Sequence, residues 1–153
     1  MRGRALYGHL DNVPLDAILF GDAPITAEEF SKWHRQAVEA LSDSSSIGIG
    51  WAAKLVNLLL KVRAYIGTEG RPGLREHLHP PIDNKLVEAI RNRYPIDGSQ
   101  RAQNFELRRR VDLGSPISSV RSYEEYLYVI EGLREVARRE GCGLCEVEQL
   151  WPG

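Results

Sequence analysis

Helical periodicity, opened twice by the same capping pattern, is the feature that most constrains this chain. Thr26 is followed three residues later by Glu29, and Ser122 by Glu125, which is the spacing of a capping box at the start of a helix. Behind each box, apolar residues recur at intervals of three and four, the period of an amphipathic helix. Convincing alternating strand patterns are absent from the sequence. The chain is therefore predicted to be all-α.

The predicted helices fit one helical domain spanning residues 1–153, a length sufficient for a sizeable core. A helix-hairpin-helix element is expected at about 26–66, and the cluster of serines ends its first helix. Further helices are expected at about 82–94, with Asp83 or Asn84 as N-cap, at about 101–111, and at about 122–140.

The second helix of the pair, from about Trp51 to Ile66, carries a continuous apolar stripe flanked by lysines. The stripe consists of Trp51, Leu55, Leu58, Leu59 and Val62. This spacing is typical of a face that packs on a core, and Trp33 has the same spacing on the first helix. Both tryptophans are therefore expected in the core more readily than in a site.

Charge and hydropathy exclude several classes of protein. The net charge of −1 argues against a protein that merely coats nucleic acid. Residues 85–121, however, hold eight Lys/Arg against four Asp/Glu, and such a basic face can bind phosphates locally. A solvated helix face explains any single arginine equally well. No apolar run reaches the length of a membrane span, and the N-terminus lacks the apolar core of a signal peptide, so a cytoplasmic protein is expected.

Two cysteines, Cys142 and Cys145, form a single C-x-x-C motif. A zinc site of this type needs a second pair of ligands, which the sequence does not offer nearby. The motif follows a predicted helix, whereas redox pairs usually follow a strand. Two small buried residues at a helix junction are the favoured interpretation, and neither a metal nor a cofactor is predicted.

Gly48-Ile49-Gly50 stands between the first two helices. Glycines allow a tight turn and close approach of a ligand, and the N–H groups at the start of the next helix can bind an anion. Lys54 follows in the first turn of that helix and could add a charge. Taken alone, however, a Gly-x-Gly between helices favours a plain turn.

The order of two motifs adds to this pattern. After the Gly-x-Gly helix and a long Gly/Pro-rich connection comes Pro81-Ile82-Asp83, at the start of another predicted helix. A hairpin Gly-hydrophobic-Gly followed by Pro-hydrophobic-Asp resembles the helix-hairpin-helix DNA glycosylase superfamily. The match covers roughly Thr26 to Tyr94, although the connection is longer here than is usual in that family. Some glycosylases of this general type excise bulky modified bases, such as glucosylated hydroxymethylcytosine, in defence against phage.

The resemblance implies a glycosylase in which Asp83 is the catalytic carboxylate. Cleavage of an N-glycosidic bond passes through an oxocarbenium-like sugar, which a carboxylate can stabilise while it orients water. An ordinary N-cap aspartate remains the alternative for Asp83. Lyase-competent members carry a lysine where this chain has Ala52. The expected enzyme is therefore monofunctional: it uses water and leaves an abasic site.

The same resemblance assigns residues to the binding of double-stranded DNA, including phage DNA with modified bases. The residues expected to contact DNA are Gly48, Ile49, Gly50, Lys54, Lys85, Arg108 and Arg109. The residues expected in the pocket for a flipped base are Trp51, His79 and Asn84. Neither a membrane nor an obligatory protein partner is inferred.

Two other functions remain open on the sequence. A noncatalytic helix-hairpin-helix module would keep the hairpin and the arginines and leave Asp83 as a cap. A helical interaction protein without nucleic acid would fit the near-neutral charge.

Overall fold

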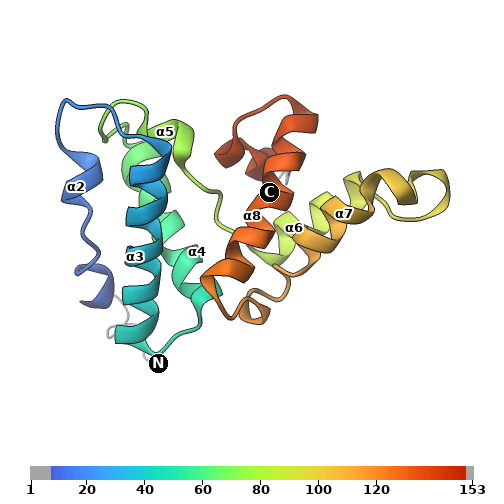
Figure 1. Ribbon diagram of the computed structural model, residues 1–153, viewed down its shortest axis with the longest axis horizontal. Helices are drawn as coiled ribbons and strands as arrows, with labels where there is room; N and C mark the ends of the chain where they lie inside the picture. The colour runs from blue at the N-terminus through green and yellow to red at the C-terminus, as the bar shows by residue number, and fades with distance from the viewer. Residues whose placement is uncertain (1–7, 151–153) are drawn as a thin grey trace.

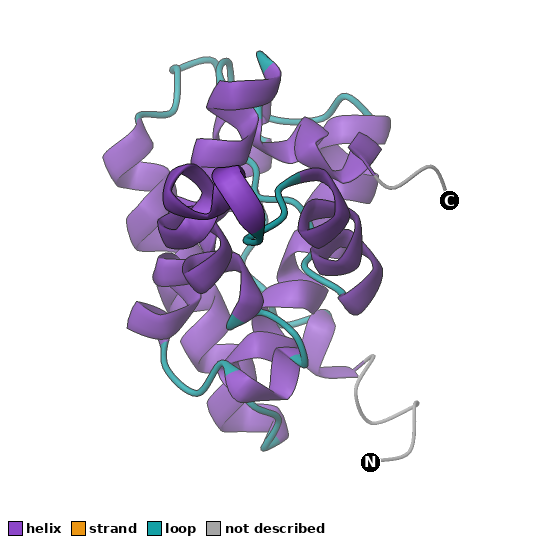
Figure 2. Cartoon of the chain, turned by 90° about the vertical axis from the view of Figure 1, so that its right-hand side faces the viewer, coloured by secondary structure: helices purple, strands orange, loops and turns teal. Residues whose placement is uncertain are grey.

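Every regular element between residues 8 and 150, the part of the chain that the computed structural model describes, is a helix (Figure 2). This confirms the predicted all-α class. The α-helices are α2 (Asp16–Leu19), α3 (Ala27–Ser45), α4 (Ile49–Leu60), α5 (Leu74–His77), α6 (Asn84–Arg93), α7 (Arg101–Asp112) and α8 (Tyr123–Glu140). A π-helical turn, η1 (Lys61–Ile66), continues α4, and the 3-10 helices are η2 (Gly98–Gln100), η3 (Ile117–Ser119) and η4 (Leu144–Leu150).

Side-chain caps fix the helix starts that the sequence predicts. The Thr26 hydroxyl accepts a hydrogen bond from the Glu29 N–H at 3.1 Å. The Ser122 hydroxyl accepts one from the Glu125 N–H at the same distance. Each bond satisfies one of the N–H groups that a helix start leaves without a partner. At its other end α8 stops at Gly141, whose φ of 67° is left-handed.

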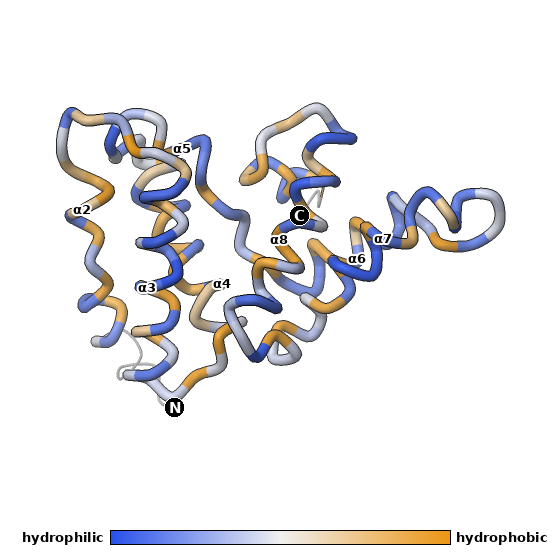
Figure 3. Tube along the Cα trace, viewed as in Figure 1, coloured by the Kyte–Doolittle hydropathy of each residue, from blue (hydrophilic) through white to orange (hydrophobic). Residues whose placement is uncertain are grey.

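The buried face of α4 differs from the predicted one. Within the expected stripe, Trp51 is 46% exposed, Leu58 37% and Val62 57%. The face that packs against α3, α8 and η3 instead carries the small or medium side chains Ala52, Ala53, Val56 and Leu60. Small side chains allow neighbouring backbones to approach closely, so this face makes the tighter contact. Figure 3 shows apolar residues recurring along the helices without separating these two faces.

The helices form two groups joined by one extended segment (Figure 1). The first group contains α2 to α5 and the second contains α6 to α8 with η4. Residues 78–83 run from α5 to α6 between the two groups, and Leu78 and Ile82 of this segment are buried in the core. One hydrophobic core includes residues of both groups. None of the helices between residues 8 and 150 combines the length and apolar character needed to cross a membrane.

The long connection between η1 and α6 is tied to the rest of the fold. The Arg71 guanidinium donates to the carbonyls of Ala23 and Pro24 at 2.8 and 3.0 Å and pairs with Glu29 at 3.0 Å. These bonds attach the connection to the start of α3. The connection thereby directs residues 78–83 into the junction of the two groups.

A matched pair of substitutions tests which face of α4 and η1 is buried. Val56→Ala removes a fully enclosed side chain and should lower the free energy of unfolding by about 2 kcal/mol. Val62→Ala makes the same chemical change at an exposed position and should alter it by less than about 0.5 kcal/mol. Urea unfolding followed by circular dichroism measures both. Equal effects, or a larger effect at Val62, would contradict the observed orientation.

Candidate functional site

Asp83 lies at the N-terminus of α6, where residues 78–83 end. Its Oδ1 accepts a hydrogen bond from the Leu86 N–H at 2.9 Å, so Asp83 rather than Asn84 is the N-cap. The side chain is partly exposed, and its second oxygen has no bonding partner in the described part of the chain. Ile82, just before it, is 1% exposed and anchors the backbone. The result is a carboxylate with one oxygen fixed and the other open to a ligand.

The segment between α7 and α8 connects this carboxylate with the start of α4. Ser115 Oγ donates to Asn84 Oδ1 at 2.9 Å. Further along the same segment, the Val120 carbonyl accepts from the Gly50 N–H at 3.2 Å. The N-termini of α4 and α6 therefore contact one short stretch of chain, and α8 begins directly after it.

The glycine pair between α3 and α4 has a packing role at its second position. A Cβ on Gly50 would lie 2.2 Å from the Ile117 carbonyl oxygen, whereas one on Gly48 would meet nothing within 4 Å. The Gly50 N–H is already bonded to Val120. This amide is therefore not available to a phosphate as the chain stands. Among residues 48–50, only Gly48 and Ile49 keep amides that could face an anion.

The basic residues expected at DNA have varied positions. Arg108 is 9% exposed and donates to the Tyr94 carbonyl at 2.9 Å, a position that argues against a phosphate contact. Arg109 is exposed and pairs with Glu106 at 2.9 Å. Lys54 lies over the Trp51 ring, and Lys85 is exposed on α6. The basic stretch is therefore partly neutralised by contacts within the protein.

The three residues expected in the base pocket lie in different surroundings. Trp51 is exposed on α4, and Asn84 is exposed at the start of α6. His79 is 6% exposed and lies inside the junction of the two helix groups. The pocket that His79 lines includes neither Trp51 nor Asn84.

His79 belongs to a buried chain of hydrogen bonds that links four parts of the fold. Tyr123 Oη lies 2.7 Å from His34 Nδ1, and His34 Nε2 lies 2.8 Å from Asn57 Oδ1. Asn57 Nδ2 donates to Tyr126 Oη at 2.9 Å, and Tyr126 Oη lies 2.8 Å from His79 Nδ1. These side chains come from α3, α4, α8 and residues 78–83.

One backbone carbonyl fixes the positions of the protons in this chain. Asn57 Nδ2 also points at the Pro80 carbonyl, 3.4 Å away, which can only accept. The Asn57 oxygen must therefore face His34, whose Nε2 carries a proton and whose Nδ1 accepts from Tyr123. The Tyr126 oxygen accepts from Asn57, and its own proton goes to His79 Nδ1, because an unbonded buried hydroxyl is unfavourable.

Burial keeps both histidines of the chain neutral. It lowers the pKa of His34 from 6.5 to about 4, against a smaller opposing effect of the Asn57 hydrogen bond. Burial also lowers the pKa of His79 well below its usual range, and the nearby His34 adds to the effect. Since His79 is neutral with Nδ1 as acceptor, its proton lies on Nε2. The motifs of the sequence did not identify His34, Asn57, Tyr123 and Tyr126. A histidine on a predicted core face and an asparagine within an apolar run are the signals that could have done so.

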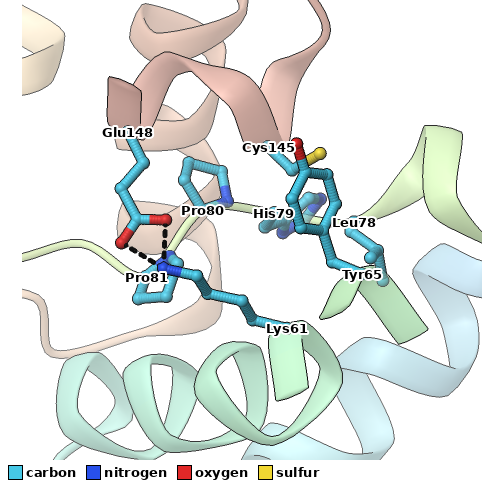
Figure 4. Close-up of a pocket in the computed structure, with 8 residues that line it drawn as sticks. All are labelled: Lys61, Tyr65, Leu78, His79, Pro80, Pro81, Cys145 and Glu148. Carbon is cyan, nitrogen blue, oxygen red and sulfur yellow. Dashed lines mark hydrogen bonds and ion pairs between the residues drawn. The ribbon is translucent and has the colours of Figure 1, made fainter. Parts of the chain in front are cut away.

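His79 also lines a small pocket. It has a volume of about 20 Å³, which is room for about one water molecule. Lys61 and Glu148 form an ion pair of 2.7 Å on one side, and Tyr65 and Cys145 lie on the other (Figure 4). The pocket therefore combines residues of η1, of the segment 78–83 and of η4.

Cys142 and Cys145 are free thiols near the C-terminal end of the described chain. Both side chains are half-buried. Burial raises the pKa of both thiols, because it disfavours the charged thiolate. Within residues 8–150, no three His, Cys, Asp or Glu side chains are grouped so as to hold a metal ion. Comparison with protein families, curated proteins and solved structures finds no match for this chain.

The two glycines before and within α4 give a second matched test. Gly50→Ala should lower the free energy of unfolding by about 2 kcal/mol or more, because the new methyl group overlaps the Ile117 carbonyl. Gly48→Ala has open space and an ordinary φ of −65°, so its effect should stay within about 1 kcal/mol. Chemical unfolding measures both. Equal tolerance of the two substitutions would mean that η3 does not pack on Gly50.

Acid should weaken the fold through the buried histidines. In the unfolded chain His34 binds a proton near pH 6.5, but in the folded chain only near pH 4. Between these values the unfolded state holds more protons, so stability falls as the pH falls. His34 alone should remove about 2 kcal/mol between pH 7 and pH 5. Urea unfolding at both pH values tests the loss, and an NMR titration in which His34 takes up a proton near pH 6.5 would refute its cause.

Proposed function

We propose that this protein is a monofunctional DNA glycosylase in which Asp83 is the catalytic carboxylate. Asp83 carries the proposal because one of its oxygens is fixed by the Leu86 N–H and the other is open, at the N-terminus of α6. A fixed carboxylate needs little reorganisation when positive charge develops on a sugar. It can also orient the water that attacks C1′.

The surroundings of α4 support water rather than an amine as the nucleophile. Ala52, where lyase-competent members of the resembling superfamily have a lysine, is fully buried. Lys54 has its ammonium 5.3 Å from the centre of the exposed Trp51 ring, on the outside of the helix. We therefore infer an abasic site as the product, without cleavage of the strand.

Contact with double-stranded DNA would be local. Several arginines of the basic stretch pair within the protein, as Arg91 and Arg108 do with Asp112. The groups best placed for phosphates are the remaining amides at the start of α4, together with the partly exposed side chain of Lys54. Substrates with modified bases, including those of phage DNA, are the ones to test first, and an antiviral role belongs to this proposal.

A second candidate is a helical interaction protein without nucleic acid. The exposed apolar residues of α4 and η1 favour it, since Trp51, Val62 and Ile66 are 46%, 57% and 67% exposed. Such groups on one helix surface are typical of contact sites for other proteins. The structure does not show what would cover them.

Asp83→Asn separates catalysis from capping. Asparagine caps helices as well as aspartate does, so the fold should be retained. The loss of the negative charge should slow base release at least ~100-fold. The assay uses duplex DNA with natural, damaged or phage-type modified bases, followed by hot alkali to cut abasic sites. Asp83→Ala serves as a comparison, because it loses both the charge and the cap. Loss of the cap should lower the free energy of unfolding by about 1 kcal/mol.

Three results would contradict the proposal in different ways. Strand cleavage without alkali would show a lyase. Salt-sensitive DNA binding without base release on any substrate would support a noncatalytic DNA-binding module. Absence of DNA binding at low salt would favour the interaction protein.

A further inference from the structure

The outer face of α4 and η1 carries an apolar row with the spacing of a coiled-coil seam. This outer seam consists of Trp51, Leu55, Leu58, Val62 and Ile66. Its first four members are four, three and four residues apart, which is the spacing that lets two helices interlock side by side. Leu55 is partly buried and the other four are exposed. Since the opposite face of α4 packs on α3, α8 and η3, the outer seam is a second apolar face on the same helix.

The outer seam is suited to the side of another helix. It runs over residues 51–66, which corresponds to a length of ~24 Å at the rise of an α-helix. A row of large apolar side chains on one exposed surface is typical of a contact site for another protein. The helix is already formed and held by the core, so little conformational entropy is lost when a partner covers it.

Lysines border one side of the outer seam. Lys54 and Lys61 each stand directly before a member of the seam, at the flanking position that sets partner choice and orientation in coiled coils. Lys61 is paired with Glu148 at 2.7 Å. Lys54 has no carboxylate partner in the described part of the chain, and its ammonium lies 5.3 Å from the centre of the Trp51 ring. Lys54 is therefore available to a carboxylate of another molecule.

Carboxylates border the other side. Leu59, on that side of α4, lines an open pocket of about 670 Å³ together with Arg63 and residues 10–17. Asp11 and Asp16 are exposed in this lining, and neither forms an ion pair with a residue that the structure describes. Arg63 is already ion-paired within the chain. The outer seam thus has a basic flank and an acidic flank.

We propose that the outer seam binds the same seam of a second copy of this chain, forming a parallel two-fold dimer. A two-fold axis along the helices brings the basic flank of each copy against the acidic flank of the other. In a parallel seam, a residue at the position of Lys54 faces the position five residues later on the other helix, which is Leu59. Lys54 would then enter the pocket that holds Asp11 and Asp16 of the second copy.

The charges also exclude the opposite orientation. In an antiparallel two-fold dimer, like flanks meet, so Lys54 of one copy would face Lys61 of the other and the aspartates would face aspartates. Like charges across an interface oppose association. The identities within the seam agree with two parallel helices, since β-branched Val62 and Leu58 stand at the alternating positions that favour this form.

The dimer goes beyond the proposed glycosylase and does not depend on it. The two proposals share Lys54, and a dimer would withhold this side chain from DNA. The tests of the dimer contain no DNA and no base release, so either proposal can fail while the other holds.

A matched pair of leucines tests the interface. Sedimentation equilibrium of the full chain should show the mass rising from one chain to two, with a dissociation constant of ~10–100 µM, because a seam of this length is short for a stable interface. Leu58→Glu should weaken the dimer at least ~10-fold, since it places a charge inside the seam. Leu127→Glu makes the same change on α8 at the same exposed fraction of 37% and should leave the dimer unchanged.

A mass that stays at one chain up to ~500 µM would overturn the proposal and leave the outer seam to a different protein. Equal weakening by the two leucine variants would place the contact between copies elsewhere.

Exchanged charges test the orientation. Lys54→Glu and Asp16→Lys should each weaken their own dimer ~5-fold or more, because each creates two repulsive contacts. Mixed together, the two variants should associate more tightly than either does alone, because both contacts of the mixed dimer then join opposite charges. Lys32→Glu, at an exposed position on α3, is the control and should have no effect. A tighter dimer of Lys54→Glu would show an antiparallel arrangement and overturn the proposal, as would a mixture no tighter than its components.

Discussion

The hydrogen bonds of Asn57 join segments of the fold that are far apart in the sequence. Its side chain lies on α4 and bonds to His34 of α3, Tyr126 of α8 and the Pro80 carbonyl. A buried polar network is stable only when its members are satisfied, and every fully enclosed side-chain polar atom of residues 8–150 has a partner. Because Asn57 requires all three partners at once, the network permits one arrangement of the two helix groups around residues 78–83.

The position of Asp83 follows from this arrangement. Asn57 binds the Pro80 carbonyl, Ile82 is buried two residues later, and the Asp83 side chain then begins α6. The carboxylate is thus aimed by the core rather than by a flexible loop. The same carbonyl orients the protons up to His79 Nε2, so the position of the Asp83 carboxylate and the tautomer of His79 both depend on a single backbone group.

Local sequence signals predicted the helices well, whereas contacts between distant segments escaped them. The boxes at Thr26 and Ser122 act within one turn, and both caps are present. The face of α4 could not be read in this way, because apolar residues occur on both of its sides and the choice depends on α3, α8 and η3. Gly50 shows the same limit, since its missing Cβ makes room for a carbonyl 67 positions away, at Ile117.

The candidate site shows a similar division between local and distant information. The Pro-Ile-Asp motif indicated Asp83 as a cap because capping is local, and the structure confirms the cap. The network and the pocket combine residues from α3 to η4, and the π-helical turn that carries Lys61 has no signal in the periodicity. The charge of residues 85–121 was likewise a sum over residues, and a sum does not show where each side chain points. The structure shows that Arg108 is directed inward to the Tyr94 carbonyl.

In the proposed glycosylase, affinity for DNA would have to come from geometry more than from net charge. With a net charge of −1 and with arginines such as Arg91 and Arg109 already paired, few cations remain for phosphates. At the start of α4 the amides of Gly48 and Ile49 could face an anion, whereas the starts of α6 and α8 are already capped by Asp83 and Ser122. A small number of phosphate contacts implies a shallow dependence of binding on salt. Recognition in the proposed enzyme would then depend mainly on contacts with the base rather than on the phosphates.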